Sequence, residues 1–267
     1  MKKLLSIFLV ALSVLTMFLT SCGQKKEKIL VLYYSQSNTT KTLALEFQNQ
    51  LGADIQEITC VNGYDGDFKQ TIDRWQKELS ENIFPEIKPI EKNLKDYDVI
   101  FLGYPIWGGT YALPMASFLK NADFSGKKIV PFCTFGSGGL NTSSADLKKN
   151  IKNATILDGY GLRQARLSNA KEEVEKFLIK SGFKQGEVEK FDEFSEQKDV
   201  SEAEKDIFNQ ACGDYQMPLG RPVSVGSRNI SGGKQYLFTV EGENGSKGQI
   251  YVLVKDGQKP EFTEVVR

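Results

Sequence analysis

The chain has 267 residues, which is enough for one large domain or two modest ones. Its hydrophobic content of 40% and its charged content of 25% are typical of a globular protein. Lysine plus arginine and aspartate plus glutamate both number 34, so no basic excess indicates a nucleic-acid partner. Histidine is absent, which excludes Ser-His-Asp and Cys-His nucleophiles and every histidine-ligated metal site.

The N-terminus resembles the signal peptide of a bacterial lipoprotein. Two early lysines precede an apolar run at residues 4–19, which is too short for a comfortable membrane span. The tetrad at residues 19–22 resembles a lipobox, in which the cysteine is acylated and becomes the new N-terminus. We therefore expect a signal peptide over residues 1–22 with lipidation at Cys22, a tether over residues 23–27, and an exported protein anchored in the cell envelope. The alternative is an ordinary signal peptide with a chance cysteine.

The remaining cysteines do not form a redox or metal motif. If Cys22 is lipidated, three cysteines are left, at Cys60, Cys133 and Cys212, and none belongs to a CxxC pair. A thioredoxin-like site and a zinc ribbon are therefore unsupported, and small buried hydrophobes are the expected role. The mature chain would carry 32 basic and 34 acidic side chains, a formal charge of −2.

Strands and helices alternate in the first two thirds of the chain. Predicted strands cover residues 29–34, 53–59, 98–103, 128–134 and 154–157. Predicted helices cover residues 40–51, 68–81, 114–119, 143–151 and 171–180. Continuous apolar runs favour strands that are buried on both faces, as in a parallel sheet. The predicted fold class is an α/β, doubly wound, five-stranded parallel sheet over residues 28–183.

The sequence changes character after Gly182. Residues 184–200 are charged and interrupt the alternation, as a linker does. A helix is predicted over residues 201–212, because Ser201 and Glu204 have the spacing of a capping box. Strands are predicted from residue 222 onward and at 236–240, 249–254 and 262–266, with a hairpin signal at 231–234. We expect a small α+β domain over residues 201–267, with a vague likeness to cystatin-like modules.

Polar and glycine-rich segments follow the first, third and fourth predicted strands. Ligands of open parallel sheets bind beyond the carboxyl ends of the strands, so these segments are the candidate site. The first segment contains Ser35, Gln36, Ser37, Asn38, Thr39 and Thr40 and enters a helix. Its hydroxyls and backbone N–H groups at a helix start favour a phosphate. The alternative is a helix N-cap built from the same residue types.

The other two segments are suited to a flat ligand. The second contains Pro105, Ile106, Trp107, Gly108 and Gly109, where tryptophan offers stacking area and glycines let the backbone approach. Its alternative is a tryptophan that packs in a turn. The third contains Thr134, Phe135, Gly136, Ser137, Gly138 and Gly139, a loop that can present N–H groups to ring carbonyls. Its alternative is a flexible crossover.

Together these motifs resemble the flavodoxin family over about residues 28–183. The resemblance is carried by residues 34–40, by residues 97–108 and by residues 124–128 with the strand and Gly-Ser-Gly-Gly loop after them. It implies FMN as the cofactor, with phosphate on the first segment and the flavin ring flanked by the other two. Many relatives have Gly-Asn where this chain has Asn38-Thr39. Asparagine is the next-best residue for the left-handed conformation that glycine allows.

The implied function is that of an FMN-dependent redox protein, either an electron carrier or an NAD(P)H- or quinone-linked reductase. No residue stands out as a general acid or base, so no catalytic residue is assigned. A charge of −2 gives little of the steering field of an acidic shuttle, which favours a reductase or a membrane-tethered donor. The alternative is a binding or structural lipoprotein whose flavodoxin-like domain has lost flavin. The expected contacts are a membrane, through the N-terminal lipid, and an unspecified redox partner.

Overall fold

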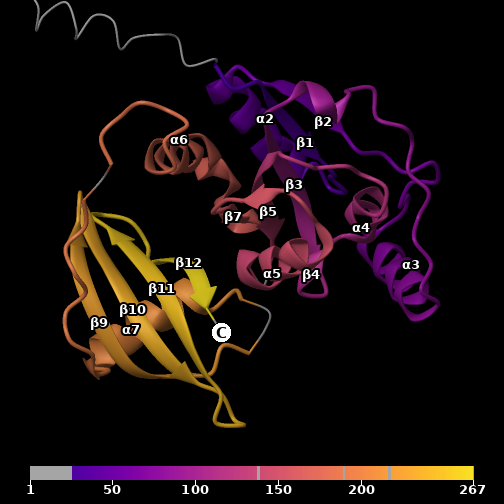
Figure 1. Cartoon of the computed structure of the whole chain (residues 1–267). Helices are drawn as coiled ribbons and strands as arrows, with labels where there is room; N and C mark the ends of the chain where they lie inside the picture. Colours follow the sequence, from indigo (N-terminus) through magenta and orange to yellow (C-terminus); the bar gives the residue numbers. More distant parts are fainter. Residues whose placement is uncertain (1–25, 137–138, 189, 216–217, 267) are drawn as a thin grey trace, which may run out of the picture.

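The computed structural model describes residues 26–136, 139–188, 190–215 and 218–266. Cys22, Ser137 and Gly138, which the sequence places in the lipobox and in the third loop, lie outside the described residues. The chain forms two units, an α/β unit (residues 28–183) and a C-terminal module (residues 195–266), each with its own sheet (Figure 1). Within the described ranges, no helix is long and apolar enough to cross a membrane.

The α/β unit has a parallel sheet with the order β2-β1-β3-β5-β6. Its strands are β1 (Ile29–Tyr33), β2 (Asp54–Glu57), β3 (Val99–Trp107), β5 (Lys128–Phe135) and β6 (Thr155–Ile156). The direction of winding reverses between β1 and β3, which places the ligand crevice of such sheets beyond the ends of these strands. The predicted fold class is therefore confirmed, with β2 at the edge.

Helices cover both faces of this sheet. They are α2 (Thr39–Leu51), α3 (Phe68–Ser80), α4 (Leu113–Leu119), α5 (Leu140–Asn150) and α6 (Ala170–Lys180), with short 3₁₀ turns η1 (Leu94–Asp96) and η2 (Gln164–Asn169). Successive residues of β1 point to opposite faces, so Leu32 packs with α4 while Val31 packs with α2 and α6. Each fully buried aliphatic or aromatic side chain contributes about 1.5–3 kcal/mol to stability. Two apolar layers therefore hold the sheet that carries the site.

Two strands differ from their predicted extent. The third predicted strand ends at Gly103, whereas β3 continues to Trp107 because Pro105 pairs with Thr134 of β5. It then turns back into β4 (Thr110–Tyr111), an antiparallel hairpin. The fifth predicted strand, 154–157, is divided: β6 is only two residues long, and β7 (Tyr160–Arg163) pairs further along β5. The extension of β3 and the division of the fifth strand both depend on pairing partners distant in sequence, which local patterns do not specify.

The C-terminal module is a helix packed on an antiparallel sheet. Its elements are α7 (Glu202–Cys212) and strands β8 (Lys198–Asp199), β9 (Arg221–Ile230), β10 (Gly233–Glu241), β11 (Lys247–Lys255) and β12 (Glu261–Val266). The predicted capping box of Ser201 and Glu204 is present. Phe208 of α7 packs against Phe238 of the sheet, with ring centroids 5.2 Å apart. The predicted α+β class is confirmed, but β8 lies inside the segment expected to be a linker.

Candidate functional site

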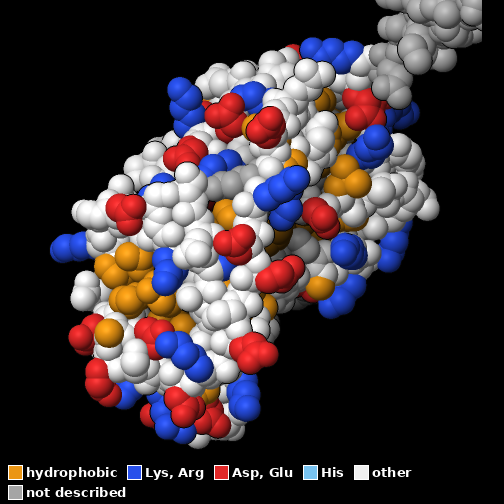
Figure 2. Space-filling model, turned by 90° about the vertical axis from the view of Figure 1, so that its left-hand side faces the viewer, with side chains coloured by type: hydrophobic (Ala, Val, Ile, Leu, Met, Phe, Trp, Pro, Cys, Tyr) orange, Lys and Arg blue, Asp and Glu red, His pale blue; other side chains and the backbone are white. Residues whose placement is uncertain are grey.

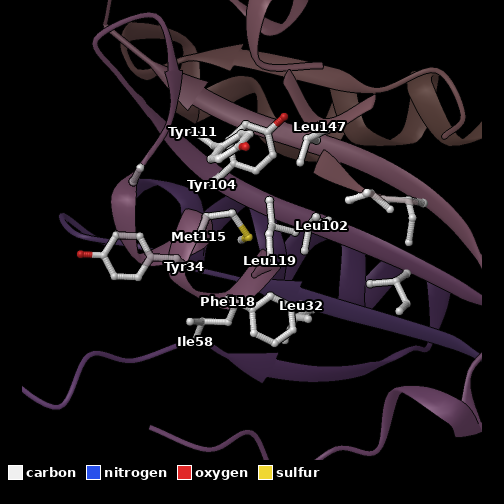
Figure 3. Packing of buried hydrophobic residues seen from close by; sticks show 14 of the residues in the cluster. Leu32, Tyr34, Ile58, Leu102, Tyr104, Tyr111, Met115, Phe118, Leu119 and Leu147 are labelled. Carbon is white, nitrogen blue, oxygen red and sulfur yellow. The ribbon is translucent and has the colours of Figure 1, made fainter. Parts of the chain in front are cut away.

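The three segments come together at the carboxyl edge of the parallel sheet. The hydroxyl oxygens of Thr40 and Thr134 lie 2.7 Å apart in a buried hydrogen bond, which joins the first and third segments. The rings of Tyr34, which directly precedes the first segment, and of Trp107 meet edge to face at 6.0 Å, which brings the start of the first segment next to the second. Tyr34 lies at one end of the buried cluster, with its hydroxyl directed away from Met115 (Figure 3). Residues about 70 and 100 positions apart in sequence therefore border one site.

The first segment forms an open start to α2. Asn38 occupies the N-cap position with φ of 61°, and its side chain makes no capping hydrogen bond. The Ser35 hydroxyl accepts from the Lys41 N–H at 3.1 Å, while the Ser37 and Thr39 hydroxyls lie 3.1 Å apart. Among the described residues, no hydrogen bond satisfies the N–H groups of Thr39 and Thr40. The first turn therefore keeps free donors beside three hydroxyls.

The asparagine at this turn takes the conformation that glycine would otherwise provide. Its left-handed backbone costs a non-glycine residue about 1–2 kcal/mol, and asparagine tolerates it best. Asn38 therefore holds the left-handed backbone of this loop without a glycine. The Asn38 side chain is exposed and does not cap the helix, so the predicted alternative of a helix cap is not met by this residue.

The charge of Lys41, in the first turn of α2, is neutralised within the fold. The ammonium of Lys41 lies 3.2 Å from the Glu57 carboxylate, which also accepts from the Tyr33 hydroxyl at 3.1 Å. Gln36 is held by its side chain: it accepts from the Tyr34 hydroxyl at 2.6 Å and donates to the Tyr64 carbonyl at 2.6 Å. Its amide group is therefore occupied, and the remaining donors of the segment are neutral N–H and hydroxyl groups.

The second segment is a tight turn packed on α3. Gly108 and Gly109 join β3 to β4 with φ of 56° and 90°. A Cβ atom at Gly108 would lie 2.6 Å from Cζ2 of Trp75, so glycine is required there for space as well as for conformation. Trp107 is partly buried and its ring meets that of Tyr64 at 5.0 Å, nearly perpendicular. Trp107 therefore packs with Tyr34 and Tyr64 in a cluster of rings, here called the aromatic wall. Part of the Trp107 side chain stays accessible to solvent.

The third segment divides into a core part and a surface part. Thr134 and Phe135 are buried in β5, so their side chains belong to the sheet and its core. Gly136 is exposed, and its carbonyl accepts a hydrogen bond from Nε of Arg163 at 3.3 Å. Gly139 immediately precedes α5. Contacts with a ligand from the described part of this segment would therefore come from the backbone.

Residues that the sequence did not single out complete the aromatic wall. The Tyr64 hydroxyl donates to Glu78 in a short hydrogen bond, and Nε of Arg74 lies 2.7 Å from the same carboxylate. The Arg74 guanidinium stacks over the Tyr64 ring at 4.0 Å. Burial raises the pKa of Tyr64, and the bond to Glu78 raises it further, so the phenol stays neutral. The i,i+4 spacing of Arg74 and Glu78 is visible in the sequence. Their contact with Tyr64 is not, because it depends on α3 folding back over the loop that carries Tyr64.

Comparison with known proteins assigns the α/β unit. The profile of the flavodoxin family matches residues 28–180, more than half of the chain. The chain belongs to the flavodoxin family. This confirms the resemblance that the three loop motifs carry. The match ends before the C-terminal module, which lies outside the family profile.

Several solved structures are similar to this flavodoxin. A candidate flavoprotein from Bacteroides eggerthii is 28% identical, covers 60% of this chain and 100% of its own, and has a TM-score of 0.53. One from Bacteroides uniformis is 27% identical, with coverages of 57% and 100% and a TM-score of 0.50. A flavoprotein from Lactobacillus acidophilus, crystallised in complex with FMN, is 24% identical, with coverages of 54% and 97% and a TM-score of 0.45. No curated protein matches the chain.

The described groups at this edge of the flavodoxin's sheet are backbone N–H groups, hydroxyls and aromatic rings, which are suited to binding a ligand. In the described part of the chain, no group of three or more cysteine, aspartate or glutamate side chains is arranged to hold a metal ion. Burial raises the pKa of Tyr34 above its usual value and that of Cys60 to about 11. Both groups are therefore protonated at neutral pH. The assignment of individual loop residues to a cofactor stays a prediction.

Proposed function

We propose that this flavodoxin binds FMN at the edge formed by β1, β3 and β5 and uses it in electron transfer, as a carrier or as a reductase linked to NAD(P)H or quinone. The first turn of α2 carries the proposal. Its N–H groups at Thr39 and Thr40 have no partner among the described residues, and the same segment carries the hydroxyls of Ser35, Ser37 and Thr39. A phosphate at a helix N-terminus satisfies such donors and is stabilised by the helix dipole.

The hydroxyl and N–H donors of the first segment can hold a phosphate group without an arginine. Lys41 is engaged by Glu57, so hydroxyl and N–H donors would hold the phosphate dianion. Asn38 supports this by taking the left-handed conformation that opens the turn. A flat ring would lie near Trp107, whose accessible part borders the same edge, and near the backbone of Gly136. FMN itself would supply the hydride and one-electron chemistry, and the protein would orient it and limit solvent.

The charge distribution bears on the choice between carrier and reductase. On the face shown in Figure 2, Lys and Arg side chains are interspersed with Asp and Glu side chains rather than separated into fields of one sign. An electrostatically steered shuttle needs a surface field of one sign to reach its partners rapidly. The mixed charge on this face, together with the formal charge of −2 of the mature chain, therefore favours a reductase, or a donor that a membrane tether keeps near its partner.

We also propose that the protein is anchored to the cell envelope through Cys22. The support is the sequence pattern of two lysines, an apolar run and the tetrad ending at Cys22. One acyl chain binds a membrane only marginally, so stable attachment requires more than one chain. Mass spectrometry of the mature N-terminus tests this. A diacylated or triacylated peptide beginning at Cys22 is expected, and an unmodified chain that begins elsewhere would contradict the anchor.

Flavin binding is tested by titrating the purified mature protein with FMN and with riboflavin. Under the proposal FMN binds at least tenfold more tightly, because riboflavin lacks the phosphate that the first turn of α2 would hold, and tenfold corresponds to about 1.4 kcal/mol. Dithionite reduction should then bleach the bound flavin reversibly. Absence of binding by both compounds would favour the rival function, a binding or structural lipoprotein that has lost flavin.

A further inference from the structure

Arg163 links the candidate flavin site to the C-terminal module. It is the last residue of β7 and pairs in register with Phe135, at the carboxyl edge of the sheet. Its side chain is only 8% exposed, and its Nε donates to the Gly136 carbonyl at 3.3 Å. Gly136 belongs to the third segment of the candidate site. One end of the contact is thus the backbone next to the expected flavin position.

The other side of the same guanidinium faces the C-terminal module. It lies over the Phe262 ring at 4.5 Å and over the Tyr215 ring at 5.0 Å. The Asp214 carboxylate lies 3.8 Å from one terminal nitrogen. Cation–π contacts contribute about 0.5–1 kcal/mol when exposed and about 2 kcal/mol or more when desolvated. Phe262 is buried and Tyr215 is half-buried, so the two rings together hold the guanidinium in place.

Further contacts hold β12 against the same edge. Arg166 of η2 forms ion pairs with Glu261 of the module at 2.7 Å and with Glu173 of α6 at 2.6 Å. A Cβ atom at Gly139 would come within 3.9 Å of the Val265 carbonyl oxygen. Figure 1 shows β12 directed toward the side of the α/β unit that bears β7 and α5. The module therefore approaches the third segment at Gly139, and it reaches Gly136 through Arg163.

Burial makes the position of Arg163 depend on the module. A guanidinium stays charged at any physiological pH, and burying it without partners is costly. Here the partners are one carbonyl from the α/β unit and two rings and a carboxylate from the module. Without the module, the guanidinium loses most of its partners and gains access to solvent. The hydrogen bond that fixes Gly136 would then compete with water.

We propose that the C-terminal module is a working part of the flavin site: through Arg163 it positions the backbone at Gly136 and thereby increases the affinity of the site for FMN. Arg163 is a positioning residue, since it acts through Gly136. The proposal rests on the proposed function for its ligand. The positioning of Gly136 is a property of the protein alone and can be measured without flavin.

The test compares three variants of the mature protein: Arg163→Met, Tyr215→Leu and the control Arg228→Met. Arg228 is a matched control because it also stacks on two rings, Phe191 at 4.6 Å and Phe194 at 4.4 Å, and its Nε also donates one hydrogen bond, to Gln235. All these contacts lie within the module and the segment 190–194 that precedes it, away from Gly136. Tyr215→Leu leaves Arg163 in place and removes one of its two aromatic partners on the module side.

Two readouts are measured, amide hydrogen exchange of the flavin-free protein and the dissociation constant for FMN. We expect Arg163→Met and Tyr215→Leu to accelerate exchange in peptides containing Gly136, with exchange in β1 unchanged, and Arg163→Met to weaken FMN binding about tenfold. Arg228→Met should alter neither. Unchanged exchange at Gly136 in Arg163→Met, or an equal change in Arg228→Met, would overturn the proposal.

Failure of the proposed function would look different from failure of this inference. If the wild-type protein binds no FMN, the proposed function is wrong, and the exchange measurement still decides whether the module positions Gly136. If wild type binds FMN and Arg163→Met binds it equally well, the link between Gly136 and flavin is wrong. If Arg163→Met does not fold, Tyr215→Leu provides the same two readouts from the module side.

Discussion

Replacing Gly108 by alanine tests the packing of the second segment against α3. The backbone at Gly108 has φ of 56°, which costs an alanine about 1–2 kcal/mol. The added Cβ would also lie 2.6 Å and 2.7 Å from two ring atoms of Trp75, an overlap that forces the helix or the turn to move. Overpacking of this kind costs about 1–3 kcal/mol. We therefore expect Gly108→Ala to lower the free energy of unfolding by about 2–5 kcal/mol.

A double-mutant cycle with Trp75→Ala separates the two costs. In the Trp75→Ala background the overlap is absent, so Gly108→Ala should cost only its conformational part, and the coupling energy should be about 1–3 kcal/mol. Gly109→Ala is the control, because a Cβ atom there meets nothing within 4 Å. Urea denaturation measures all the variants. An equal cost of Gly108→Ala with and without Trp75 would refute the assigned contact between this turn and α3.

Two further predictions concern the aromatic wall and the buried thiol. Trp107→Ala should weaken FMN binding by about 0.5–1.5 kcal/mol or more, the contribution of an aromatic contact. It should also reduce the quenching of tryptophan fluorescence by FMN to the part that comes from Trp75, the other tryptophan. Unchanged affinity would mean that Trp107 only packs on Tyr34 and Tyr64. Burial raises the pKa of Cys60 to about 11. Because the thiolate is the reactive form, the rate of Cys60 alkylation by iodoacetamide in the folded protein should keep rising above pH 9. A plateau below pH 9 would contradict this environment for the thiol.

The sequence predicted those features that depend on local patterns. Apolar runs such as residues 29–34 identified the buried strands, because strands covered on both faces need no polar alternation. Gly52 ends α2 in the left-handed conformation with φ of 61°, as its position after Leu51 predicts. The left-handed Asn38 could be anticipated for the same reason, since few residues other than glycine tolerate that conformation.

The features that escaped prediction depend on contacts between distant residues. β3 extends to Trp107 because β5 offers a partner at Thr134, and no local property of residues 104–107 reveals that partner. The stacking of Arg74 on Tyr64 requires α3 to fold back over the loop that precedes it. Arg163 lies outside every predicted strand and helix, and nothing in the sequence singles it out. Its role as a link appears only when Phe262, about 100 positions later, is packed against it.

The most direct test of the central claim is a charge placed in the first segment. Ser37 is exposed, and aspartate is a good residue near a helix start, so Ser37→Asp should fold normally. Its carboxylate would repel a phosphate a few ångströms away by at least about 1 kcal/mol even with full solvent screening, and by more in a partly desolvated loop. Ser246→Asp, in an exposed turn of the C-terminal module, is the control with the same change of charge.

The decisive measurement is the dissociation constant of FMN and of riboflavin for wild type, Ser37→Asp and Ser246→Asp. The account predicts that Ser37→Asp weakens FMN binding about tenfold or more, leaves riboflavin binding nearly unchanged, and that Ser246→Asp affects neither ligand. Equal FMN affinity in wild type and Ser37→Asp would contradict the assignment of the phosphate to the start of α2.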